Sequence, residues 1–209
     1  MLTEIKLSDK IDNNTFVTTL DHEDIENNYL SNNIVIIDNF VSEEDIGIFN
    51  DLKVMNIAWN PKSCRNGELR KIWYEEAVKK PRSYSNHPQF KDALIRLEEK
   101  IKYFAKGFSF INNSHWQDGW LDYDATLRVS EIVDEEMHLD RYKFDPLRVF
   151  VNIDNTHRIW KTTSKDEDFK EGEKHLIAFA PGALWCCNTK EVPHQIGYGK
   201  RAVLFTFYF

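Results

Sequence analysis

The chain has 209 residues, of which 42% are hydrophobic, 13% aromatic and 29% charged, a composition typical of a globular protein and not of a disordered one. We expect a single domain over 1–209. Its 34 acidic residues outnumber the 27 basic residues and give a net charge of −7, which argues against a nucleic-acid partner held by phosphate neutralisation. The first residues include no apolar run suited to a signal peptide or a membrane span, so we expect a cytoplasmic protein without a membrane partner.

The first quarter of the chain predicts a polar start, one strand and one helix. Residues 1–33 are rich in Asp and Asn and predict an irregular lead-in. The β-branched run 34–37 predicts a strand buried on both faces. Ser42 stands before three acidic residues, which is typical of a capped helix start, and apolar spacing extends this helix over 42–54.

A second helix is predicted over 88–106, between two segments without a clear period. Apolar residues recur there at spacings of three and four, so one stripe of the helix should pack on a sheet. Residues 56–87 contain scattered Pro and Gly and predict a loop with short strands, and 107–119 predicts a loop. The part 34–119 should therefore supply a strand and supporting helices.

From residue 120 onward, short runs of β-branched and aromatic residues alternate with turn residues. No helical period lies between these runs, so residues 120–209 predict a closed or double-sheet β core, of which the jelly-roll and cupin architecture is one option. The fold class is therefore mainly β with supporting helices. The expected strands are 120–132, 147–153, 158–163, 174–179, 184–187 and 203–209.

The three cysteines predict packing residues and no disulfide or metal site. Cys64, Cys186 and Cys187 include no CxxC spacing, and the adjacent pair in a strand should point to opposite faces. We expect all three to be reduced.

Chemistry in this sequence is concentrated in histidine and carboxylate, since it has no nucleophile-elbow or phosphate-loop motif. Asp140 follows His138 by two residues, so on an extended segment both side chains leave the same face and can bind one ion. A second HxD, formed by His22 and Asp24, lies in the polar lead-in, and we expect it to be solvated.

His194 and Arg201 follow the HxD late in the chain. Two imidazoles and one carboxylate on one face of iron(II) leave three positions open, enough for a chelating co-substrate and dioxygen. An Arg on a neighbouring strand suits the far carboxylate of such a co-substrate, because its planar fork donates two parallel hydrogen bonds.

The order of His138-Leu139-Asp140, His194 and Arg201 resembles the HxD…H…R pattern of the iron(II)- and 2-oxoglutarate-dependent oxygenases, over roughly 120–209. The segment 36–44 is also similar to the first strand and helix of prolyl-hydroxylase-like members. Pro146, followed by the strand 147–152 with Arg148 near its start, looks most like the aspartyl/asparaginyl β-hydroxylase and free-proline hydroxylase branch.

This resemblance implies a double-stranded β-helix, a cofactor set and an activity. His138, Asp140 and His194 would bind Fe(II), and Arg201 would pair with the distal carboxylate of 2-oxoglutarate. The enzyme would hydroxylate an sp³ carbon of an amino-acid-like small molecule or peptide and release succinate and CO₂. Arg148 would bind a substrate carboxylate or, equally well, form an ion pair with a nearby Asp.

The sequence departs from the family pattern in two places and leaves alternatives open. Phe150 stands where the branch often has a His, and Arg201 comes early after His194, with Lys200 beside it. Alternation groups Arg201 with Val203, Phe205, Phe207 and Phe209 and favours it over Lys200. The alternative functions are a non-catalytic cupin-like metal- or ligand-binding protein, and the same chemistry on a nucleobase or lipid.

Overall fold

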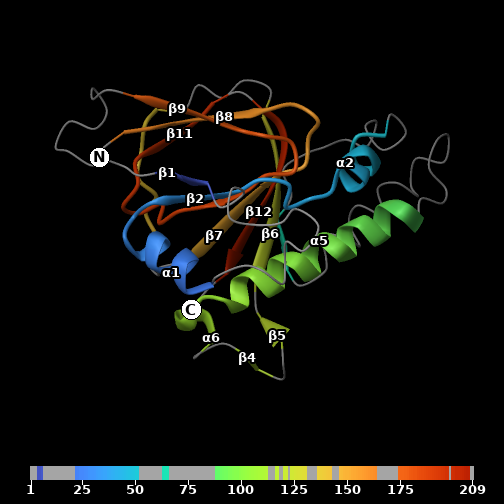
Figure 1. Cartoon of the computed structure of the whole chain (residues 1–209), viewed down its shortest axis with the longest axis horizontal. Helices are drawn as coiled ribbons and strands as arrows, with labels where there is room; N and C mark the ends of the chain where they lie inside the picture. Colours follow the sequence, from blue (N-terminus) through green and yellow to red (C-terminus); the bar gives the residue numbers. More distant parts are fainter. Residues whose placement is uncertain are drawn as a thin grey trace.

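Two β-sheets face each other in the computed structural model, and helices lie across the outer face of the larger one (Figure 1). The structure describes residues 4–6, 22–51, 63–65, 88–112, 116–117, 120–121, 123–130, 136–142, 146–163, 174–197 and 199–207.

The large sheet has the strand order β1-β2-β10-β7-β12-β6-β3, and the small sheet has the order β11-β8-β9. All neighbours pair antiparallel except β1 and β2, which pair parallel. A further pair, β4 and β5, stands apart. The bounds are β1 Glu4–Lys6, β2 Ile34–Ile37, β3 Ser63–Arg65, β4 Trp116–Gln117, β5 Trp120–Leu121, β6 Tyr123–Ser130, β7 Leu147–Asn152, β8 Arg158–Thr162, β9 His175–Phe179, β10 Leu184–Cys186, β11 His194–Ile196 and β12 Gly199–Phe207.

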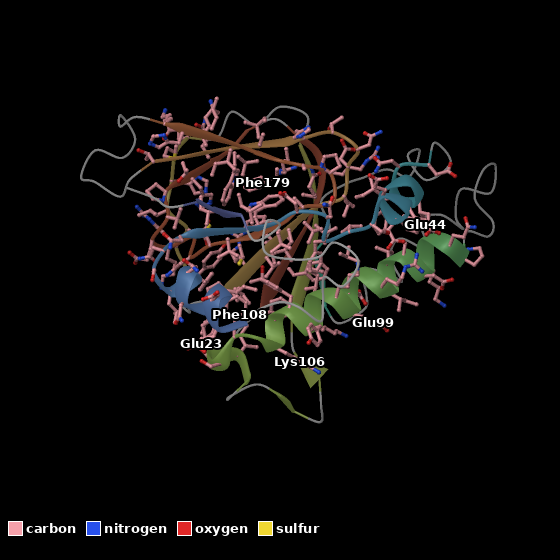
Figure 2. The ribbon with its side chains drawn as sticks, in the orientation of Figure 1. Glu23, Glu44, Glu99, Lys106, Phe108 and Phe179 are labelled. Atoms are coloured by element: carbon pink, nitrogen blue, oxygen red, sulfur yellow. The ribbon has the colours of Figure 1, made fainter. Side chains whose placement is uncertain are left out.

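The large sheet buries both of its faces, and each face has its own hydrophobic core. Strand β2 shows this directly, because Val35 and Ile37 belong to the helix-side core while Ile34 and Ile36 belong to the core between the sheets. The predicted strand with two buried faces is confirmed. Figure 2 shows Phe179 in the space between the sheets and Phe108 on the helix side.

The core between the sheets is mostly aromatic. Trp185 is stacked between Phe179, at a centroid distance of 4.0 Å, and Phe150, at 5.2 Å. Trp160 meets the Trp185 ring edge-on at 6.2 Å. Such pairs combine large apolar area with favourable ring geometry, so the space between the two sheets around Trp185 is filled with side chains.

The two predicted helices form, one of them shorter than expected. α5 spans Pro88–Lys106 as predicted, and its apolar stripe packs on the helix-side core. α2 spans Glu43–Phe49, and the Asp45 N–H donates to Ser42 Oγ at 3.2 Å, which confirms the predicted cap. Residues 52–54 of the predicted helix lie outside the described residues.

The prediction of an irregular lead-in and of a loop over 107–119 is wrong in part. α1 spans His22–Leu30, and Ile25 and Tyr29 bury against the helix-side core. These two apolar residues stand four apart among polar ones, so the stripe is too narrow to predict a helix from sequence. β1 also lies in the lead-in, and α6 (Ser109–Asn112) and β4 lie in the predicted loop.

The predicted strands 147–153, 158–163, 174–179 and 184–187 appear as β7 to β10, and 203–209 falls in β12, which begins earlier. The predicted strand 120–132 is instead divided into β5, which pairs with β4, and β6 of the large sheet, and β11 appears in addition. Residues 122, 131–132 and 208–209 lie outside the described residues. A strand of only three residues has no alternation to recognise, so β11 was not expected. The adjacent cysteines divide as predicted, with Cys186 in the helix-side core and Cys187 between the sheets. Among the described residues, no helix combines the length and hydropathy needed to cross a membrane.

Gly182 should tolerate no side chain. Its φ is 78°, and a Cβ there would lie 2.5 Å from the Val41 carbonyl oxygen. Gly182→Ala should therefore lower the free energy of unfolding by about 2 kcal/mol or more in a denaturant titration. Gly47→Ala is the matched control, because a Cβ at this helical position meets nothing within 4 Å. It should raise stability by about 1 kcal/mol, and equal losses for both variants would contradict a specific steric constraint at Gly182.

Candidate metal centre

A short backbone pairing brings His138 and His194 side by side. The extended segment 136–142 follows β6 and precedes β7 in the sequence. It pairs with β11 through one antiparallel bridge. The His138 N–H donates to the His194 carbonyl at 3.0 Å, and the His194 N–H donates back at 2.9 Å. The Asp140 N–H is held in turn by the Thr189 carbonyl at 2.9 Å. The local backbone therefore fixes both halves of the site.

The side chains of His138, Asp140 and His194 converge on one point. One ligand atom from each lies within 4.8 Å of the others. The Nε2 atom of each imidazole lies 3.8 Å from an oxygen of Asp140. Because a metal bound by all three would need the donors only slightly closer, this set can hold one ion.

Both imidazoles have the tautomer that a metal ligand requires. Nδ1 of His138 lies 2.9 Å from the Glu136 carbonyl, and Nδ1 of His194 lies 3.0 Å from the Val192 carbonyl. A carbonyl oxygen only accepts, so each Nδ1 carries a proton, and in the neutral form of the ring Nε2 is the nitrogen with the lone pair. The two free lone pairs are the ones near Asp140.

Burial differs across the three side chains and defines an open side. The exposed fraction is 2% for His194, 13% for Asp140 and 38% for His138. Trp160 covers His194 at a ring distance of 5.0 Å. Burial lowers the pKa of His194 to about 4, so this imidazole is neutral near pH 7, as a ligand must be. Access to the centre is from the side of His138.

The second HxD lies on a helix and has different geometry. His22 and Asp24 occupy positions in the first turn of α1, so their spacing follows a helical period and not strand alternation. Among the residues that the structure describes, three potential metal ligands come together at one place, and they are His138, Asp140 and His194.

Arg148 faces the same centre from β7. Its Nη1 contacts Oδ2 of Asp140, and its guanidinium lies over the rings of Tyr142 and Phe150, 5.3 Å from each centroid. The residue is buried, with 5% exposed. Of the two roles left open by the sequence, the structure displays the ion pair, and the acid is Asp140.

Arg201 lies on the helix side of the large sheet, opposite to the core between the two sheets. Its Nη1 donates to Oδ1 of Asn50, the cap residue of α2, at 3.1 Å and lies 3.8 Å from Asp154. The β12 residues that reach the core between the sheets are Ala202 and Leu204. The predicted grouping of Arg201 with Val203, Phe205 and Phe207 is confirmed, and the face that they share is the one toward the helices; Phe209 lies outside the described residues. Alternation in a sequence groups residues by face without telling which face holds the site.

The contacts that sequence reasoning missed come from loops. Tyr142 covers Arg148 and Thr189 holds the Asp140 backbone, and neither belongs to a motif or a periodic pattern. Cys187 is also buried between the sheets, where burial raises the pKa of its thiol.

No protein-family model matches the sequence, and no curated protein is significantly similar to it. Solved structures are similar across most of the chain. The Kdo hydroxylase KdoO, a non-heme Fe(II) alphaketoglutarate dependent dioxygenase in complex with succinate and Fe(III), matches with a TM-score of 0.56 at 14% identity over 90% of this chain and 83% of its own.

Two further structures match in the same way. The dioxygenase for auxin oxidation from Arabidopsis thaliana, in complex with 2-oxoglutarate, has a TM-score of 0.54 at 10% identity over 100% of this chain and 92% of its own. A prolyl hydroxylase from Trichoplax adhaerens, with a hypoxia inducible factor peptide, has a TM-score of 0.51 at 10% identity over 90% and 88%. The chain therefore has the predicted double-stranded β-helix, the fold that these dioxygenases share.

Proposed function

We propose that this protein is an iron(II)- and 2-oxoglutarate-dependent dioxygenase that hydroxylates an sp³ carbon, with release of succinate and CO₂. The observation that carries the proposal is the convergence of two imidazole Nε2 atoms and one carboxylate at the open end of the core between the sheets. The fold alone does not decide function, but this donor set on this fold supports the chemistry.

The residues present fit both groups that the reaction needs. Two neutral imidazoles and one carboxylate suit iron(II) and leave coordination positions for other ligands. His138, Asp140 and His194 would hold the ion. The buried positive charge of Arg148 beside them suits an anionic co-substrate. When bound, iron with 2-oxoglutarate and dioxygen supplies the oxidation of an unactivated C–H bond.

The chain's own residues would prepare this centre for that chemistry. The Glu136 and Val192 carbonyls fix the orientation of the two imidazoles through Nδ1. Trp160 and the aromatic stack behind it keep water from the buried side of His194. His138 is the most exposed of the three, so substrate would approach from its side.

We infer that the substrate is an amino-acid-like small molecule or a peptide. The branch-like segment from Pro146 to Asn152 supports this class, and the net charge of −7 disfavours nucleic acid. Among the similar structures, the Trichoplax adhaerens prolyl hydroxylase is bound to a peptide fragment. A substrate carboxylate on Arg148, the role predicted from sequence, would have to share the guanidinium with Asp140.

Metal and co-substrate binding can be measured before any substrate is known. Adding Fe(II) and 2-oxoglutarate without oxygen should give a weak visible charge-transfer band. His138→Ala should abolish this band, because only two of the three donors remain. His157→Ala is the matched control, since His157 is an exposed histidine outside the group, and it should retain the band. Absence of the band in the unmodified protein would favour a non-catalytic binding protein.

Substrate class can be tested by succinate release. Free amino acids, short peptides, nucleosides and lipids should be screened under air with Fe(II) and 2-oxoglutarate. We expect substrate-dependent succinate from at least one amino acid or peptide. Release that depends only on a nucleoside or a lipid would reject the proposed substrate class while keeping the chemistry.

Arg201 should matter for stability more than for co-substrate binding, because among the described residues it contacts Asn50 at the end of α2 and buried Asp154. Arg201→Met leaves buried Asp154 without this cation and should lower the free energy of unfolding by about 3 kcal/mol. Asn50→Ala, which removes the partner on α2, is the matched control. Both variants should keep the half-saturating 2-oxoglutarate concentration within about twofold. A tenfold increase for Arg201→Met alone would restore the role predicted from sequence, and the same increase for Lys200→Met would assign it to Lys200.

A further inference from the structure

Arg148 contacts Asp140 directly, one of the three residues His138, Asp140 and His194 that form the triad. Nη1 of Arg148 and Oδ2 of Asp140 form an ion pair inside the barrel. Exposed fractions are 7% for the Arg148 side chain and 13% for that of Asp140, so solvent screens the pair little. The pair is therefore stronger than one on the surface would be.

The guanidinium is packed against two aromatic rings in this position. The Tyr142 and Phe150 rings contact it, and the backbone it comes from is a central strand. β7 lies between β10 and β12, and Arg148 pairs with Thr206 across the ladder. A planar guanidinium packed against rings can impose an orientation on a carboxylate, which a flexible ammonium cannot do as well.

The contact leaves the two oxygens of Asp140 unequal. Each oxygen lies 3.8 Å from one imidazole Nε2, Oδ1 from that of His138 and Oδ2 from that of His194, but only Oδ2 also accepts from Arg148. A carboxylate that bound an ion through both oxygens would occupy two coordination positions. One that binds through a single oxygen leaves an additional position open, and a chelating co-substrate together with dioxygen requires three.

We propose that Arg148 is a positioning residue, which holds one oxygen of Asp140 so that the other oxygen alone ligates the metal. This inference rests on the proposed function, and it differs from the substrate-binding role predicted from sequence. Arg148 acts through Asp140, and its own positive charge opposes the metal. The benefit of orientation has to exceed that repulsion.

Orientation of Asp140 and repulsion of the metal by Arg148 predict opposite changes in metal affinity, so the direction of the change in Arg148→Met distinguishes them. If Arg148 orients Asp140, Arg148→Met should weaken metal binding by about 10- to 100-fold. This is the usual effect of removing a residue that hydrogen-bonds to a metal-ligating side chain. If Arg148 only balances the charge of Asp140 in the metal-free protein, Arg148→Met should bind metal as tightly as the unmodified protein or more tightly. Arg148→Lys keeps the charge and one donor, and should recover part of the affinity.

Mn²⁺ is a suitable probe, titrated into the metal-free protein without 2-oxoglutarate or substrate. Free Mn²⁺ measured by EPR gives the affinity. Broadening of the bound signal in ¹⁷O-labelled water gives the number of metal-bound waters. Loss of Asp140 as a ligand would raise this number, whereas ligation through both of its oxygens would lower it. We expect one fewer bound water in Arg148→Met, because Asp140 can then use both oxygens.

Arg96→Gln is the matched control. Arg96 forms an ion pair with Asp45 between α5 and α2, away from the triad, so its loss should change neither the affinity nor the water count. Unchanged or tighter binding in Arg148→Met, or an unchanged water count, would overturn the proposal. Failure of the unmodified protein to bind Mn²⁺ would instead reject the metal centre itself. If Arg148→Met does not fold, the affinity and water count of Arg148→Lys decide the question.

Discussion

The two hydrogen bonds between His138 and His194 are the constraint on which the centre depends. They join the segment that carries the HxD to β11 at the one place where their backbones pair. Both imidazoles are then tied through Nδ1 to nearby carbonyl groups, so each Nε2 points to Asp140. A metal site assembled from distant parts of a chain needs such preorganisation, because otherwise ion binding would have to provide the energy for ordering the ligands.

The rest of the fold maintains this constraint. The large sheet has an apolar core on each face, so β7 and β12 are central strands and their side-chain directions are fixed. The aromatic stack of Phe150, Trp185 and Phe179 fills the barrel behind the triad. Burial keeps His194 neutral, and it also strengthens the pairing of Arg148 with Asp140. Burial therefore affects two of the three candidate ligands, His194 directly and Asp140 through its ion pair with Arg148.

Much of the fold was predictable from periodicity. The buried strand β2, the amphipathic helix α5 and the strands after residue 120 each have a pattern long enough to recognise. α1 and β11 escaped prediction because each has only two or three informative positions. The spacing of His138 and Asp140 also predicted a shared face, since alternation in an extended segment is a local property.

By itself, the sequence determined which residues share a face and which residue types could bind a metal. Tertiary structure decided which of the two buried faces lies beside the group of His138, Asp140 and His194: Arg148 contacts Asp140, whereas Arg201 contacts Asn50 at the end of α2. The physical reason is that alternation with a period of two divides residues between two faces but does not tell which face packs on which neighbour. The identity of each face depends on the elements that pack on it, and those elements come from remote segments of the chain.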